Sequence, residues 1–251
     1  MTTLLLRLGA PLQSWGTSSR FVRRNTDRVP SRSGIIGLLA AAQGLDRTTP
    51  LRTPPDQRPV DPTEDLLGLR IGVRIDQPGR LERDFQTAHT RDGANSMPLS
   101  YRFYLADAVF AVALEGHPQL LDTLHHAMRN PKFPLYLGRR SCPPAGKLLH
   151  GIREGTLRDR LETEPWLASP WVQRQHRNAT KDLEAVVDCD PTEPDAELVR
   201  DEPISSDPRH RQYGWRTVHR IPVTVPNLSH RDHPATVDPL DPFAALVEET
   251  L

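Results

Sequence analysis

The chain has 251 residues, of which 37% are hydrophobic, and its formal net charge at pH 7 is zero. This length suits one large domain or two small ones, and the low hydrophobic content predicts sizeable loops or a tail. Only Cys142 and Cys189 are present, without a CxxC pair, which argues against a disulfide framework and a thiolate metal site. The Leu4–Leu8 run is too short for a signal peptide and no segment has the length of a membrane span, so we expect a cytoplasmic protein.

The neutral total hides a strong separation of charge along the chain. Residues 1–58 carry nine Arg against three Asp, and residues 129–160 carry eight Lys or Arg against two acids. Residues 182–202 carry nine acids against one Arg, and we expect this acidic segment to face solvent rather than a basic neighbour. The basic segments predict a polyanion partner. Arginine suits bidentate phosphate contacts, although a GC-rich genome would also enrich arginine.

The N-terminal elements follow from the spacing of apolar residues. Residues 3–8 are apolar on both faces of an extended chain, which predicts a buried strand. Apolar residues at helical spacing predict a helix over 33–45, which Ser31 or Ser33 can begin and Gly44 can end.

The middle of the chain reads as strands around a second helix. Residues 69–76 alternate between apolar and polar, which predicts a half-buried strand, and residues 83–103 predict a polar hairpin that turns at an Asp-Gly pair. Residues 104–114 predict one apolar strand. Pro118 is placed to begin a helix, and residues 147–152 predict a further strand.

This order is strand, helix, strand, strand, helix, strand, the split βαβ pattern of ferredoxin-like and RRM-type domains. Such domains present an open sheet face that often binds RNA. The sequence therefore predicts an α+β fold with a ferredoxin-like core over 1–152. A smaller β-rich part over 153–225 contains a strand pair at 212–225, and a polar tail covers 226–251. Residues 46–65 are typical of a loop.

The strongest candidate site surrounds the first helix. Gln13 and Ser14 lie in a polar turn where they can donate hydrogen bonds to RNA, and Trp15 can either stack on a base or anchor the turn in the core. A basic loop follows and leads to Arg32-Ser33-Gly34, where the free N–H groups of a helix start favour phosphate. The alternative is a serine-capped helix that simply packs on the sheet. The other members of this site are Arg23, Arg24 and Gly37.

A second candidate is the segment from Tyr136 to Ser141. An aromatic residue before Gly138 and the pair Arg139-Arg140 can stack a base and clamp phosphates. The alternative is a solvated turn after a strand.

The predicted hairpin carries further candidates and a catalytic alternative. His89, Arg91 and Met97 lie where few core-forming residues occur, and Met97 can wedge beside a base, unless the segment is a disordered polar loop. His89 with Tyr101 or Tyr104 has the residue types of metal-independent RNA cleavage. The ten His are scattered, however, and His230 with His233 is the one metal-like spacing, in the predicted tail. No P-loop motif occurs, and we expect no cofactor and no metal.

Four motifs occur in order: Gln13-Ser14-Trp15-Gly16 with Pro30 to Leu39, Arg83 to Thr87 with Tyr101 to Ala108, Tyr136 to Pro144, and Arg200 to Pro203 with the Trp215 region. In this order they resemble the CasD family of type I-E CRISPR Cascade subunits, from about residue 3 to about residue 225. The resemblance implies a RAMP-superfamily fold whose thumb hairpin, at about 83–104, projects from a ferredoxin-like core. It also places Arg102 and Tyr104 at the base of that thumb.

The resemblance implies a non-catalytic subunit that binds and caps the 5′ handle of the crRNA. The implied partners are the Cascade backbone subunit and the large PAM-reading subunit, with target DNA met only indirectly and no membrane. One alternative is a metal-independent endoribonuclease that processes precursor crRNA, and another is an RRM-like RNA binder outside CRISPR systems. The predicted RNA-binding residues are Gln13, Ser14, Trp15, Arg23, Arg24, Arg32, Ser33, Gly34, Gly37, His89, Arg91, Met97, Arg102, Tyr104, Tyr136, Gly138, Arg139, Arg140 and Ser141.

Overall fold

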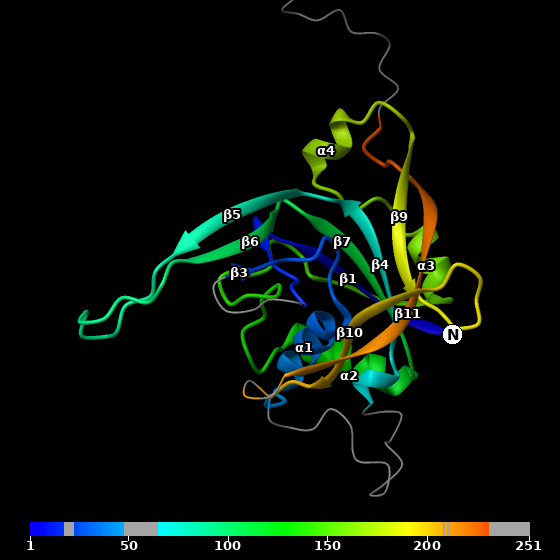
Figure 1. Cartoon of the computed structure of the whole chain (residues 1–251). Coiled ribbons are helices and arrows are strands. Elements are labelled where there is room, and N and C mark those ends of the chain that lie inside the picture. Colours follow the sequence, from blue (N-terminus) through cyan, green and yellow to red (C-terminus); the bar gives the residue numbers. More distant parts are fainter. Residues whose placement is uncertain (18–22, 48–64, 208, 210, 231–251) are drawn as a thin grey trace, which may run out of the picture.

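The computed structural model describes residues 1–17, 23–47, 65–207, 209 and 211–230 (Figure 1). Its strands are β1 (Thr2–Gly9), β2 (Leu12–Gln13), β3 (Arg23–Arg24), β4 (Arg70–Gln77), β5 (Arg80–Gln86), β6 (Ser100–Ala106), β7 (Val109–Glu115), β8 (Leu149–Glu154), β9 (Thr180–Asp188), β10 (Glu197–Ser205) and β11 (Gln212–Pro226). Its helices are α1 (Arg32–Gln43), α2 (Pro118–Arg129), α3 (Leu157–Thr163) and α4 (Pro170–Gln175), with a 3₁₀ turn at Leu66–Gly68.

A seven-stranded antiparallel sheet in the order β10-β11-β9-β4-β7-β1-β8 organises the chain. The six elements β1, α1, β4, β7, α2 and β8 follow the predicted strand–helix–strand–strand–helix–strand order. The chain is thus an α+β protein with a mainly antiparallel sheet. The predicted first helix is confirmed. The Ser31 hydroxyl accepts a hydrogen bond from the Gly34 N–H at 3.2 Å, and Gly44 ends the helix with a left-handed φ of 82°.

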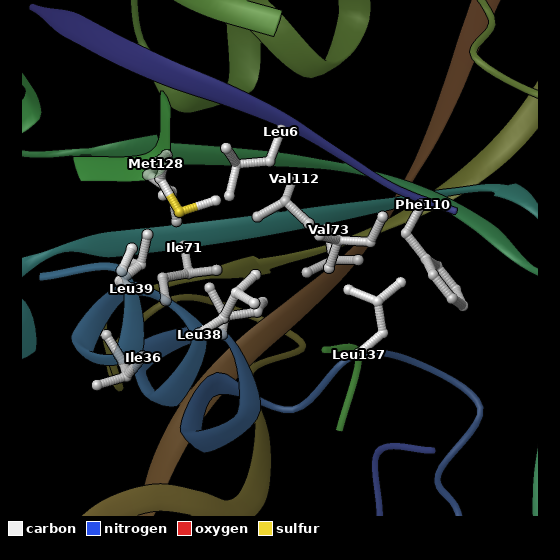
Figure 2. Close-up of a cluster of buried hydrophobic side chains, with 14 of the residues drawn as sticks. Leu6, Ile36, Leu38, Leu39, Ile71, Val73, Phe110, Val112, Met128 and Leu137 are labelled. Atoms are coloured by element: carbon white, nitrogen blue, oxygen red, sulfur yellow. The ribbon is translucent and has the colours of Figure 1, made fainter. Parts of the chain in front are cut away.

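Two helices cover one face of this sheet. Side chains of α1 and α2 pack on β1, β4 and β7, and Figure 2 shows part of this first core, including Leu39, Ile71, Val112 and Met128. The alternating apolar positions of β4 supply its side of the contact, as their period-two spacing requires.

The other face of the sheet is also covered, which corrects the prediction of an open RNA-binding face. Leu157 and Leu161 of α3 pack with Trp166 against Leu5 and Ala113 in a second core. The prediction that β4 is half-buried was wrong for the same reason, because its polar side lies beneath α3.

A buried ion pair shows how the polar side of β4 is accommodated. The Arg74 guanidinium binds the Asp76 carboxylate at 2.7 and 2.9 Å, and both side chains are fully buried. Arg74 also donates to the carbonyl oxygens of Glu164 and Pro165, both at 2.8 Å. Because every charge in this group has a partner, β4 can be covered on both faces.

Two predicted strand boundaries need correction. Residues 104–114 do not form one strand, because Asp107 adopts a positive φ of 56° and separates β6 from β7. Residues 212–225 do not form a strand pair. They belong to the single 15-residue strand β11, which pairs with β10 along its first half and with β9 along its second.

The predicted hairpin is confirmed and projects from the rest of the fold (Figure 1). Strands β5 and β6 pair from Arg80↔Ala106 to Gln86↔Ser100. The turn lies where the Asp-Gly pair predicted it, with Gly93 at a φ of 73° and its N–H bonded to the Thr90 carbonyl at 2.9 Å. Strands β2 and β3 pair with β6 and complete a second, four-stranded sheet.

The C-terminal strands join the same large sheet as the N-terminal ones. β9 pairs with β4, and the domain boundary predicted at residue 152 falls within β8, so the division into two domains stays a prediction. Most of the predicted loop at 46–65 and residues 231–251 of the predicted tail lie outside the described residues. Among the described residues, no helix is both long and apolar enough to cross a membrane.

Candidate nucleic-acid interface

The turn after β1 is packed in the core rather than exposed, and its three predicted RNA-binding side chains lie inside the protein. Gln13 is fully buried. Its amide donates to the carbonyl oxygens of Leu8 at 3.3 Å and Ala108 at 2.7 Å, and its Oε1 accepts from the Trp15 indole at 3.0 Å. Trp15 is 1% exposed and anchors the turn in the core, the alternative that the sequence left open. The buried Ser14 hydroxyl donates to the Phe103 carbonyl at 3.2 Å. Each polar group of these three side chains thus has a partner within the protein.

Gly34, a predicted site of phosphate approach, lies in tight contact with Trp15. A Cβ at this position would lie 2.8 Å from the indole of Trp15, so glycine lets α1 pack against the turn. The neighbouring Ser33 hydroxyl lies 3.3 Å from that of Ser31. Gly37 is different, because it is exposed and a Cβ there would meet nothing within 4 Å.

Arg32, a predicted phosphate contact, is buried in an ionic network within the protein. It is 5% exposed, and its Nη1 and Nε lie 2.7 and 2.5 Å from carboxylate oxygens of Asp188 and Glu202. Nη2 donates to the Leu67 carbonyl at 2.7 Å. Its backbone N–H donates to the Asp201 carboxylate, also at 2.7 Å. The anion-binding start of α1 therefore already holds an anion, the Asp201 side chain.

The same network explains part of the acidic segment that we expected to face solvent. Arg216 contacts Asp188 and donates two hydrogen bonds to Asp201, at 2.6 and 3.0 Å. Burial disfavours the charge of Arg216, but the hydrogen bonds and charges of Asp201 and Asp188 outweigh it and raise the arginine's pKa. Acids of the 182–202 segment thus neutralise arginines of α1 and β11.

The segment 136–141 packs tightly against the buried turn. Gly138 adopts a φ of 86°, and a Cβ there would lie 1.6 Å from the Ser14 carbonyl oxygen, so only glycine fits. The Ser14 N–H donates to the Leu137 carbonyl at 3.2 Å, and Leu137 and Cys142 close the loop through a 2.7 Å hydrogen bond. The half-buried Tyr136 accepts a hydrogen bond from Arg47.

The two adjacent arginines of this segment have different environments. Arg139 donates to the carbonyl oxygens of Phe103 at 3.1 Å and Arg24 at 2.9 Å, and its guanidinium lies 4.5 Å from the ring centroid of buried Tyr104. Arg139 thus braces β3 and β6, whereas Arg140 and Ser141 are exposed. Of the two predicted phosphate contacts, Arg140 has an exposed side chain and Arg139 a half-buried one.

An exposed basic and aromatic surface lies on the second sheet. Because side chains alternate along strands, the register of β5 and β6 places Leu81, Arg83 and Phe85 on the same face as Tyr101 and Phe103. We call these five residues the hairpin face. Phe85 is 65% exposed and Tyr101 39% exposed.

Arginines already stack on the rings of the hairpin face. The guanidinium of Arg83 lies 5.6 Å from the ring centroid of Tyr101, and that of exposed Arg23 lies 5.1 Å from the Phe103 ring. Arg24, also exposed, lies opposite Arg102 in the backbone register of β3 and β6. The buried Nε of Arg102 has no hydrogen-bond partner among the described residues. Such cation–aromatic surfaces can stack bases and contact phosphates together. Arg83, Phe85, Tyr101 and Phe103 were not among the predicted RNA-binding residues, although the alternation of Leu81, Arg83 and Phe85 could have indicated them.

The remaining hairpin candidates lie at its far end. His89, Arg91 and Met97 are exposed in the loop beyond β5 and β6, with His89 bridged to Ser96. His89 is not placed beside Tyr104, which pairs with Glu82 roughly 20 Å along the hairpin at the usual rise per residue. Tyr104 is also buried, so His89 and Tyr104 do not have the geometry for proton transfer to and from RNA.

A cleft of about 840 Å³ lies beside the hairpin face, between residues 26–35 and the strands β4, β9, β10 and β11. Its floor is apolar, with Ile71, Val73 and Val186. Asp27 lines it and accepts from the Thr17 hydroxyl at 2.8 Å. Burial raises the pKa of Asp27, and the charge of Asp201 adds to the rise. Within the described part of the chain, no group of His, Cys, Asp and Glu is arranged to hold a metal ion, and His233 lies outside it.

Comparison with known proteins agrees with this fold. The model of the family described as "CRISPR-associated protein (Cas_Cas5)" matches residues 3–219. The CRISPR system Cascade subunit CasD of Escherichia coli (strain K12) is 33% identical in an alignment of 174 residues that covers 61% of this chain and 70% of that protein.

Two solved structures resemble the whole fold. One, described as the crystal structure of a Cas protein, has a TM-score of 0.64 and 34% identity, covering 92% of this chain and 99% of the other. The second, from a CRISPR RNA-guided surveillance complex, has a TM-score of 0.68 and 31% identity, covering 89% of this chain and 91% of the other. This chain therefore belongs to the Cas5 family of CRISPR-associated proteins.

Proposed function

We propose that this chain is a non-catalytic RNA-binding subunit of a type I-E Cascade surveillance complex, in which it caps the 5′ handle of the crRNA. The relative named as a Cascade subunit and the match to a surveillance complex support this assignment. The strand order β8-β1-β7-β4, with α1 and α2 on one face, supports a ferredoxin-like RAMP core. The projecting β5–β6 hairpin corresponds to the thumb of that fold.

The observation that carries the proposal is the stacking of exposed arginines on the hairpin face. Arg83 over Tyr101 and Arg23 over Phe103 leave ring and guanidinium surfaces accessible to bases, and Arg24 and Arg140 add exposed charge nearby. RNA with splayed bases is recognised by stacking and backbone contacts of this kind. The bound handle sets the register in which the backbone subunit and the large PAM-reading subunit engage the guide and read target DNA. This chain therefore meets target DNA only indirectly.

A titration of repeat-derived handle RNA with the full chain tests this function. Replacing Arg24 and Arg140 by Ala removes two exposed charges, and we expect weaker binding with a salt slope shallower by about 1.4, at about 0.7 per single-strand phosphate. Lys132→Ala, which removes an exposed charge near the end of α2, is the matched control. An unchanged affinity and salt slope in the double variant would contradict the assignment of these arginines.

The same RNA separates the subunit from the endoribonuclease alternative. We expect the full chain to bind repeat RNA with a chelator present and to leave it intact. Cleavage that His89→Ala abolishes would establish the enzyme instead.

A further inference from the structure

The second face of the large sheet carries an exposed surface that the RNA proposal does not use. The candidate RNA interface connects to the first core through Trp15, Tyr104 and Leu137, whereas Val172 of α4 packs on the second core, on the opposite face of the sheet. In Figure 1, α4 lies near the ends of β9 and β11, apart from the projecting hairpin. A ligand on one of these surfaces leaves the other accessible.

Apolar side chains are exposed at this place. Trp171 of α4 is 51% exposed, and Leu228, just beyond β11, is 72% exposed. Arg174 lies three residues after Trp171, which places both on one side of the helix, and Arg177 follows the helix end. We call Trp171, Arg174, Arg177 and Leu228 the α4 face.

Buried hydrogen bonds hold the α4 face in one conformation. The Asn227 amide, 4% exposed, donates to the carbonyl oxygens of Gln173 at 3.0 Å and of His176 and Asn178 at 3.3 Å. The Gln173 amide donates in turn to the Trp166 and Ala168 carbonyl oxygens, at 2.6 and 2.9 Å. A short helix fixed at both ends loses little conformational entropy when a partner binds.

The charged residues of the segment that carries α4 have one sign. Residues 165–181 contain Arg174, Arg177 and Lys181 and no Asp or Glu. The acid that precedes them, Glu164, pairs with Arg153 at 3.5 Å. The next acid along the chain, Asp182, accepts a hydrogen bond from the Thr224 hydroxyl at 2.7 Å. The exposed indole therefore lies on a segment of net positive charge, which is complementary to a ring of carboxylates.

We propose that the α4 face docks a protein partner that presents Asp and Glu side chains around an apolar pocket for the Trp171 indole. Tryptophan and arginine are among the residues most enriched in binding hot spots, and both are exposed on this face. The exposed aliphatic Leu228 beside α4 favours a protein over RNA, because it adds apolar area without a stacking plane. This inference rests on the proposed function, since it assigns the face to a neighbouring protein of the assembled complex.

Photocrosslinking in the assembled complex tests the proposal. The full chain carries p-benzoylphenylalanine at position 171 and is co-expressed with its neighbouring subunits and guide RNA. Phe133, 47% exposed just beyond α2, is the matched control position. We expect a protein adduct from position 171 that resists ribonuclease and maps to an Asp/Glu-rich segment of another subunit. An RNA adduct, an adduct to residues 231–251 of the same chain, the same adduct from position 133, or no adduct would overturn the proposal.

A binding measurement separates this inference from the proposed function. We expect Trp171→Ala with Arg174→Glu to weaken association with the purified neighbouring subunits by at least about tenfold. The affinity for handle RNA and the melting temperature stay unchanged, and Trp171→Tyr keeps most of the association. Equal association of wild type and double variant overturns the inference alone, whereas failure of the wild-type chain to bind handle RNA overturns the proposed function alone.

Discussion

Replacing Arg32 by Ala tests whether this arginine holds the fold together or binds RNA. The side chain is 5% exposed and its guanidinium lies between the carboxylates of Asp188 and Glu202. Removing one partner of a buried ion pair costs about 3–5 kcal/mol, because the remaining charges lose their compensation. At about 2–4 °C per kcal/mol for a chain of this size, the melting temperature falls by roughly 6–20 °C.

Thermal unfolding followed by circular dichroism measures this loss. Arg28→Ala is the matched control, because Arg28 precedes the same helix and is exposed, so we expect a change within about 0.5 kcal/mol. Handle RNA binding by the Arg32 variant, measured well below its melting temperature, is expected to equal that of wild type. A normal melting temperature together with weaker RNA binding would refute the structural role of Arg32.

Five further variants test other parts of the structure. Gly138→Ala is expected to lower the free energy of unfolding by about 3 kcal/mol or more, because its Cβ would meet a backbone carbonyl at 1.6 Å. Gly93→Ala, at positive φ in open space, is expected to lower it by about 1 kcal/mol. Equal losses in denaturant titrations would contradict this difference. Burial raises the pKa of Asp27, so the native state binds more protons than the unfolded state does. The contribution of Asp27 to stability therefore falls as the pH rises above the ordinary pKa of an aspartate. Asp27→Asn should gain stability relative to wild type as the pH rises from 4 to 7, and a relative loss would contradict burial as the cause. Phe85→Ala and Tyr101→Ala should each weaken handle RNA binding by about 1–3 kcal/mol per stacked base at unchanged melting temperature, and unchanged affinity would exclude stacking there.

The elements that local chemistry determines could be predicted from the sequence. Helix α1 follows from its apolar spacing, its Ser31 cap and Gly44, and the hairpin turn follows from an Asp-Gly pair. Pro118 at the start of α2 is a local signal of the same kind. Each depends on residues within a few positions of one another, which a single sequence displays directly.

The predicted site was less accurate because burial depends on distant residues. Gln13 looks polar and accessible in sequence, yet its amide is satisfied by the carbonyl of Ala108, 95 positions away. The partner of Arg32 at Asp188 is 156 positions away. No local pattern marks such pairs, so arginines and amides of the core were grouped with those of the surface.

The cover on the second sheet face was missed for a different reason. Helices α3 and α4 have seven and six residues, too few for an apolar period to stand out. An exposed RRM-like face was therefore expected where Leu157, Leu161 and Trp166 form a second core. The hairpin face was also not predicted, although Leu81, Arg83 and Phe85 alternate along the sequence of β5.

Crosslinking of 4-thiouridine-substituted handle RNA to the full chain, with the adducts mapped by mass spectrometry, tests the central claim most directly. We predict adducts within 80–86 and 100–106 and at Arg23, Arg24 or Arg140. Adducts confined to the start of α1 at residues 31–37, or intact RNA without any adduct, would contradict the assignment of the hairpin face as the surface that binds the handle.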